Sequence, residues 1–273
     1  MTPRHHVHAH AHARRRHITC LAALLALCFP LQILADAQTH TSPHPATLSE
    51  LWLEQPTQPA AVAYAYYWLE AHREPHRQQG LRLIEELATL SNWHALAGRK
   101  SLARSALEWQ QTIIGLQDKA GRTPARADLA SLLASPRHDP TLASLADAGY
   151  CTVPDWVEVW HFDGVSRQRW KPGLGLRGLL RSLPSGQWSM ADEAWVIAPL
   201  GAPRRIGVAA WNAGNSALVP GTRIVLALPG STQEADWVNR NLPAYLATRL
   251  PSDTCQSITL AGREPMAKGE AAR

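Results

Sequence analysis

The hydrophobic periodicity of the chain changes near residue 150, and this change limits the folds that are compatible with it. Before that point, apolar residues recur at intervals of three and four in "QQGLRLIEELATL" and "SLARSALEWQQTIIGL", which predicts helices between residues 46 and 116. After it, apolar and polar residues alternate in "WVEVWHF" and "VSRQRW", on either side of Asp163-Gly164. Because this alternation is typical of a β-hairpin, the sequence predicts an α+β protein.

Several prolines divide the first part of the chain. Because proline lacks a backbone N–H, we expect helices to break at Pro59 and Pro75. A third break is expected near Ser91-Asn92. The following stretch, residues 118–155, contains four prolines and has little periodicity, so it is predicted to be a packed connecting loop with one short helix.

The second part of the chain predicts a particular order of strands. After the first hairpin, "LRGLLRSL" is expected to be a short helix, and "EAWVIAP" and "RRIGVAAW" a second hairpin around Gly201. The run "TRIVLAL" after Pro220-Gly221 supplies a fifth strand. Two strands, a helix crossover and three further strands match the β-grasp order. In this arrangement, Trp211 and Pro220 are expected to serve the fold rather than a ligand.

The first 37 residues have the layout of a secretory signal. A basic segment precedes the apolar run "ITCLAALLALCFPLQIL", and small residues around Ala37 follow it. We expect cleavage after Ala37 and export of the mature protein. Residues 1–37 hold four Arg and one Asp, so the remainder has 23 basic and 21 acidic residues, a net of +2 against +5 for the whole chain. Such a small excess does not indicate a nucleic-acid partner.

Two of the four cysteines, Cys151 and Cys255, remain after this cleavage. In an exported chain they are expected to form one disulfide, which closes a loop of about 100 residues and contributes on the order of 4 kcal/mol if it is unstrained. The alternative is a pair of free thiols.

Several motifs, taken in order, resemble the capsule biosynthesis GfcC-like family. They are "GRTPARADL", "SPRHDPTL", Asp147, "VEVWHFDGV", "RWKPGLGL", "GVAAWNAGNSALVPGTRIVLAL" and "WVNRNLPAYLATRLP". The resemblance covers residues 46–253. It implies a periplasmic protein of a capsule or exopolysaccharide operon, with two β-grasp (SLBB-like) domains, a helical insertion in the first and a C-terminal amphipathic helix. It implies no established enzymatic activity.

The resemblance and the periodicity together give the expected domain organisation. The first β-grasp domain is expected to be incomplete, because only "QTHTSPHP" separates the cleavage site from "ATLSELWL". We predict five parts of the chain: a signal peptide at 1–37, a helical and partial β-grasp domain at 38–150, a β-grasp domain at 151–230, an amphipathic helix at 231–253 and a mobile tail at 254–273.

The sequence carries none of the spacings that mark the common catalytic or metal sites, and no cofactor or metal is expected. Arg122 is a candidate ligand for a carboxylate or phosphate of a polysaccharide or partner, or it ties loop carbonyls together. Trp156 and Trp160 share one face of a predicted strand with Glu158. If that face is exposed, the two indoles are a platform for sugar rings. If the C-terminal helix covers it, they are core residues.

The expected function is a non-enzymatic accessory role in capsule or exopolysaccharide biosynthesis or export, through binding of polysaccharide or of the outer-membrane export protein. The C-terminal helix either docks on its own domain or presents its apolar side to a membrane or membrane protein. The alternative function is a polysaccharide-modifying enzyme with a site at the domain junction, near Arg122 and His138-Asp139. A plain sugar-binding module is a third hypothesis.

Overall fold

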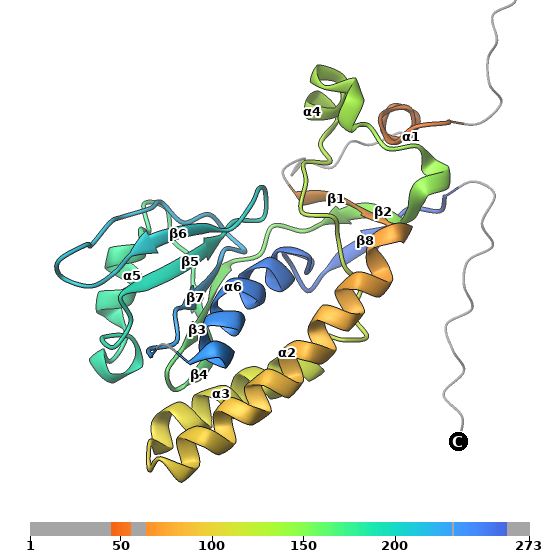
Figure 1. Ribbon diagram of the computed structural model, residues 1–273. Helices are drawn as coiled ribbons and strands as arrows, with labels where there is room; N and C mark the ends of the chain where they lie inside the picture. The colour runs from red at the N-terminus through yellow and green to blue at the C-terminus, as the bar shows by residue number, and fades with distance from the viewer. Residues whose placement is uncertain (1–44, 56–63, 231, 261–273) are drawn as a thin grey trace, which may run out of the picture. The chain divides into compact units, whose positions relative to one another are not determined.

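A computed structural model of the chain describes residues 45–55, 64–230 and 232–260. The signal peptide expected at 1–37 and the end of the expected tail, 261–273, lie outside these ranges. The described part is an α+β fold, as the sequence predicted, with two sheets and several helices (Figure 1).

The helices and strands occur in the following order along the chain. The helices are α1 (Leu48–Glu54), α2 (Glu70–Leu96), α3 (Lys100–Ile114), α4 (Leu129–Ala134), α5 (Leu176–Ser182) and α6 (Gln233–Ala247). Short 3-10 turns lie at Pro136–His138, Leu142–Ser144 and Ser185–Gln187. The strands are β1 (Ala65–Leu69), β2 (Leu145–Cys151), β3 (Trp156–His161), β4 (Gly164–Arg169), β5 (Glu193–Ile197), β6 (Arg204–Gly207), β7 (Arg223–Leu226) and β8 (Cys255–Ser257).

The smaller sheet has the order β1-β2-β8 and joins segments that lie far apart in the sequence (Figure 1). Both of its pairings are antiparallel. Three predictions were wrong here. A helix was expected where β1 lies, a loop where β2 lies, and a mobile tail where β8 lies. A Cβ on Gly149 of β2 would clash with the backbone oxygen of Gln256, so this glycine permits the close approach of β8.

The larger sheet has the order β4-β3-β7-β5-β6, with β3 and β7 parallel and the other neighbours antiparallel. Its five strands and the short helix α5 all lie where alternation and turn residues predicted them. The antiparallel pairs β3–β4 and β5–β6 are the two predicted hairpins, and β7 runs between them. The β-grasp assignment and the predicted domain boundaries remain predictions.

Helices α2 and α3 pack against each other, and α2 also contacts α6. The breaks expected within α2 were wrong, because α2 continues through Pro75 and through Ser91-Asn92. Pro75 lies in the second turn of the helix, where its missing N–H removes one backbone bond. Buried leucines then hold the rest of α2 in the core, at Leu83, Leu87 and Leu90.

The C-terminal helix α6 docks on its own chain. Thr232 caps it by accepting from the Ala235 N–H at 3.2 Å, and its apolar side is buried against β5 and β7. The helix runs without interruption through Pro243, so the second start expected near Asn241 was wrong. Within the described ranges, no helix is both long and apolar enough to cross a bilayer.

Candidate functional site

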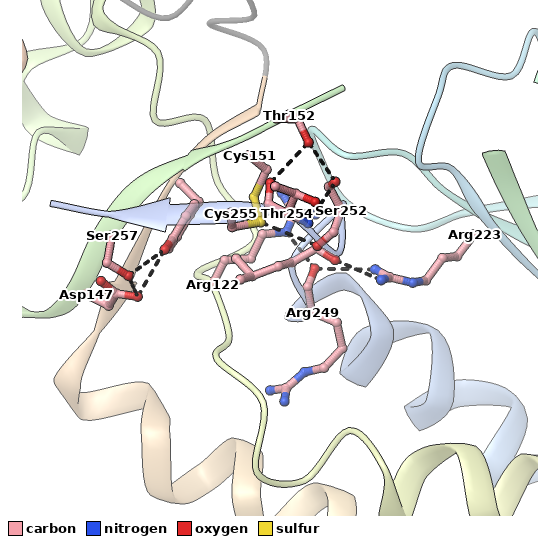
Figure 2. The surroundings of a disulfide bond; sticks show 12 residues. Arg122, Asp147, Cys151, Thr152, Arg223, Arg249, Ser252, Thr254, Cys255 and Ser257 are labelled. Atoms are coloured by element: carbon pink, nitrogen blue, oxygen red, sulfur yellow. Dashed lines mark hydrogen bonds between the residues drawn. A yellow bond between two sulfur atoms is a disulfide. The ribbon is translucent and has the colours of Figure 1, made fainter. Parts of the chain in front are cut away.

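Arg122, the residue that sequence reasoning singled out, lies buried among backbone carbonyls. Only 3% of it is exposed. Its Nε donates to the Arg249 carbonyl at 3.2 Å, its Nη1 donates to the Pro199 carbonyl, and its backbone N–H donates to the Thr248 carbonyl at 2.7 Å. Figure 2 shows Arg122 beside Arg249 and the disulfide. Burial, and secondarily the charge of Arg223, lowers the pKa of the Arg122 guanidinium to about 9.

These contacts favour the structural alternative for Arg122. It joins the segment after α3 to the end of α6 and to the loop after β5 through backbone carbonyls that accept its N–H groups. The hypothesis that Arg122 is exposed to a ligand was therefore wrong for this structure.

A second buried arginine, Arg223 of β7, is paired with the buried carboxylate of Glu158 on β3. The Arg223 Nε lies 3.2 Å from Glu158 Oε1. Its terminal nitrogens donate to carbonyls at the end of α6, at Leu246, Arg249 and Leu250. Burial lowers the pKa of Arg223, while the Glu158 carboxylate acts in the opposite direction. The pair thus fixes α6 over the sheet face that carries Glu158.

The tryptophans of β3 belong to this covered face. Trp160 has no exposed surface, its Nε1 donates to Glu158 Oε1 at 3.0 Å, and its ring meets that of Trp109 edge-on at 5.8 Å between centroids. Trp156 is half-buried, with the Arg167 guanidinium 4.1 Å from its ring centroid. The exposed platform proposed for Trp156 and Trp160 was therefore wrong, because Trp160 is buried against Trp109 of α3 and the Arg167 guanidinium lies over the Trp156 ring.

The two cysteines that remain after the expected cleavage are joined. Cys151 of β2 and Cys255 of β8 are direct partners in the sheet and form a disulfide with an S–S distance of 2.03 Å (Figure 2). Their sequence separation is 104 residues. The bond therefore anchors the short strand β8, which follows α6, to the smaller sheet.

The residues considered for acid–base chemistry have structural contacts or are exposed. Asp139 accepts from the Ser49 N–H at 3.1 Å and from its hydroxyl at 2.7 Å, which holds the start of α1. His138 is exposed on a 3-10 turn. In the ranges that the structure describes, no cluster of three or more His, Cys, Asp or Glu side chains is placed to hold a metal ion.

A pocket that sequence reasoning missed lies between α5 and the loop after β6. It has a volume of about 560 Å³, within the range of about 300–1,000 Å³ that is usual for small-molecule sites. Its lining combines apolar groups with two arginines, and it comprises Leu176, Arg177, Leu180, Arg181, Trp188, Ser189, Val208, Ala209, Ala210, Ala213 and Gly214.

The two arginines lie on one side of α5, four residues apart, so they face the same region. The sequence signal was present in "LRGLLRSL", where Leu176, Leu179 and Leu180 are buried and the arginines are exposed. Trp211, on the same loop as five of the lining residues, is 79% exposed. Trp211 was expected to serve the fold. Its exposure contradicts this, and the neighbouring Asn212 anchors the loop by donating to the Asp192 carbonyl at 3.0 Å.

Comparison with known proteins places this pocket inside a recognised family region. Residues 165–251 match the family model described as capsule biosynthesis GfcC C-terminal. This range includes α5, the loop after β6, β7 and α6. No curated protein matches the chain. The match indicates a role in capsule or polysaccharide assembly. The match thus confirms, over residues 165–251, the resemblance that the motifs suggested, and it supports a GfcC-like capsule biosynthesis family.

Proposed function

We propose that this protein is a non-enzymatic periplasmic accessory factor in the assembly or export of a capsule or exopolysaccharide, and that it acts by binding the polysaccharide. The observation that carries the proposal is the pocket between α5 and the loop after β6, which lies within the matched family region. It combines an apolar floor with two exposed guanidinium groups, a composition that suits a ligand with polar or charged substituents.

The composition of the pocket favours binding over chemistry. Among its described lining residues there is no Asp, Glu, His or Cys, which are the usual side chains of acid–base and covalent catalysis. Ser189 lines the pocket, but no described residue in the lining is a base that would activate its hydroxyl. We therefore rank the alternative, a polysaccharide-modifying enzyme, second.

The proposed location follows from the N-terminal sequence and the disulfide. The layout of residues 1–37 is that of a secretory signal, and the bond between Cys151 and Cys255 suits an oxidising compartment. In the same proposal, residues 151–230 form a β-grasp domain. An export protein is the second candidate partner, through a surface other than the apolar side of α6, which is buried.

A deletion strain tests this proposal. Surface polysaccharide would be measured in the strain alone, with the full chain restored, and with a chain that lacks residues 2–37, at matched protein levels. We expect polymer to be reduced by the deletion and restored only by the full chain. Unchanged surface polymer in the deletion strain would overturn the role in the pathway. Full restoration by the chain without residues 2–37 would overturn the periplasmic location.

A further inference from the structure

We infer that the pocket between α5 and residues 208–214 binds an acidic sugar unit, with Arg177 and Arg181 holding its carboxylate and the apolar floor holding its ring. This inference rests on the proposed function and names the ligand chemistry of the same site. It is carried by the positions of the two arginines, by the absence of a carboxylate from the described lining, and by the exposed Trp211 on the loop that forms one wall of the pocket.

Arg177 is held in place by the loop that forms the opposite wall. Its Nη2 donates to the Ala213 carbonyl at 2.8 Å, and its backbone N–H donates to the side-chain oxygen of Asn215 at 3.2 Å. A guanidinium has five N–H donors, so the bond to Ala213 fixes its position and leaves others for a ligand. Because the group is already ordered, little of its rotamer freedom remains to be lost on binding.

Arg181 adds a second positive charge one helical turn further on. Like charges four residues apart on a helix repel each other, and the described pocket lining contains no acidic side chain to offset this repulsion. Glu193, whose strand partner Gly207 precedes the lining residue Val208, has its carboxylate paired with Arg205 at 3.3 Å. A bound anion would relieve the repulsion, and the planar guanidinium fork matches a carboxylate in particular.

The floor and rim of the pocket supply apolar contact for a ring. Leu176, Leu180 and Val208 are buried beneath it, and Trp188 contributes a half-buried indole. A sugar ring presents C–H groups on its faces, which pack on such surfaces. Trp211 follows the lining residue Ala210 and leaves most of its indole in water. An extended polymer leaving the pocket would have this indole available as a second contact.

Isothermal titration of the purified mature protein tests the inference with defined probes. The probes are a hexamer of galacturonic acid, maltohexaose as its neutral counterpart, and inorganic phosphate at equal ionic strength. We expect the acidic hexamer to bind at least ten times more tightly than maltohexaose, and its affinity to fall as salt is raised. Phosphate is expected to compete weakly because it has no ring to contact the floor.

Variants locate the binding site. Arg181→Gln is expected to weaken binding of the acidic hexamer by about tenfold, and Arg177→Gln/Arg181→Gln to abolish measurable binding. Arg181→Lys, which keeps the charge but loses the fork, is expected to bind more weakly than the native protein and more tightly than Arg181→Gln. Arg169→Gln removes one exposed charge from β4, outside the pocket, and is the matched control. Circular dichroism would check that each variant is folded.

Each outcome decides a separate claim. If the acidic hexamer binds but all arginine variants behave like Arg169→Gln, the pocket assignment is overturned and the proposed function stands. Equal binding of the acidic and neutral hexamers overturns the assignment of an acidic sugar. So does binding of phosphate as tight as that of the acidic hexamer. Absence of binding by the native protein also overturns this inference, while the deletion strain tests the proposed function independently.

Discussion

Replacing Glu158 by Gln removes one charge from a buried pair without changing the size of the side chain. Glu158 is 7% exposed and Arg223 is 6% exposed. Trp160 Nε1 and Arg223 Nε both donate to Glu158 Oε1, so the amide oxygen would remain an acceptor for both, but the buried Arg223 guanidinium would lose the charge that neutralises it. The amide nitrogen would also face the Arg167 Nε, which donates to Glu158 Oε2 at 3.2 Å. Removal of one partner from a buried ion pair costs about 3–5 kcal/mol, so we expect Glu158→Gln to lower the unfolding free energy by about that amount.

The assay is equilibrium urea unfolding at pH 7 with the disulfide intact, followed by tryptophan fluorescence. For a domain of this size, the expected loss corresponds to a decrease in melting temperature of about 6–20 °C. The double variant Glu158→Gln/Arg223→Gln is expected to lose less than the sum of its two single variants, because no unpaired charge stays buried.

The control is Glu193→Gln, which removes the acidic partner of the ion pair between Glu193 and Arg205. The Arg205 side chain is 61% exposed and the Glu193 side chain 37% exposed. Exposed pairs contribute about 0–1 kcal/mol, so this variant should unfold almost as the native protein does. The reasoning is refuted if Glu158→Gln is no more destabilising than Glu193→Gln.

Three further predictions address other parts of the fold. Cys255→Ser is expected to lower the unfolding free energy by up to about 4.7 kcal/mol, the loop-entropy value for a loop of about 100 residues; urea midpoints equal to those of the native oxidised protein would contradict this. Gly221→Ala should destabilise by more than about 1 kcal/mol, because φ is +76° and a Cβ would lie 2.6 Å from the Pro251 carbonyl oxygen. Gly186→Ala, with open space at its Cβ, is the comparison, and equal melting temperatures would be evidence against the strain. Burial lowers the pKa of His76 to about 4. Between about pH 6.5 and pH 4, His76 therefore binds a proton more readily in the unfolded chain than in the folded protein. Stability is expected to fall over this window, and His76→Gln to reduce that fall in urea unfolding at pH 7 and pH 5; an unchanged pH dependence would contradict the assignment.

Local pattern was sufficient to predict the larger sheet. Alternation, Asp163-Gly164 and Pro220-Gly221 mark its strands and turns, and these strands lie near one another in sequence. The smaller sheet depends on pairing between distant segments. Its central strand, "LADAGYC", is poor in the β-branched residues that favour strands, so only the pairing with β1 and β8 makes it one. Short apolar runs such as "AYYWL" do not distinguish strand from helix.

The candidate site was less accessible from the sequence. Exposure of Arg122 and Trp160 depends on where α6 packs, and the periodicity of α6 gives its apolar side but not the surface that it covers. The sequence shows that Arg177 and Arg181 lie four residues apart on a predicted helix, but the pocket also requires the loop at residues 208–214 to lie opposite α5. The same limitation explains why Trp211 was assigned to the fold although its indole is exposed.

The most direct test of the proposed function is equilibrium binding of the mature protein to polysaccharide purified from the surface of its own strain. We predict saturable binding by the native protein and by Arg169→Gln, and loss of binding in Arg177→Gln/Arg181→Gln. Absence of binding by the native protein would contradict the proposed function, whereas equal binding by all three proteins would contradict only the assignment of the pocket.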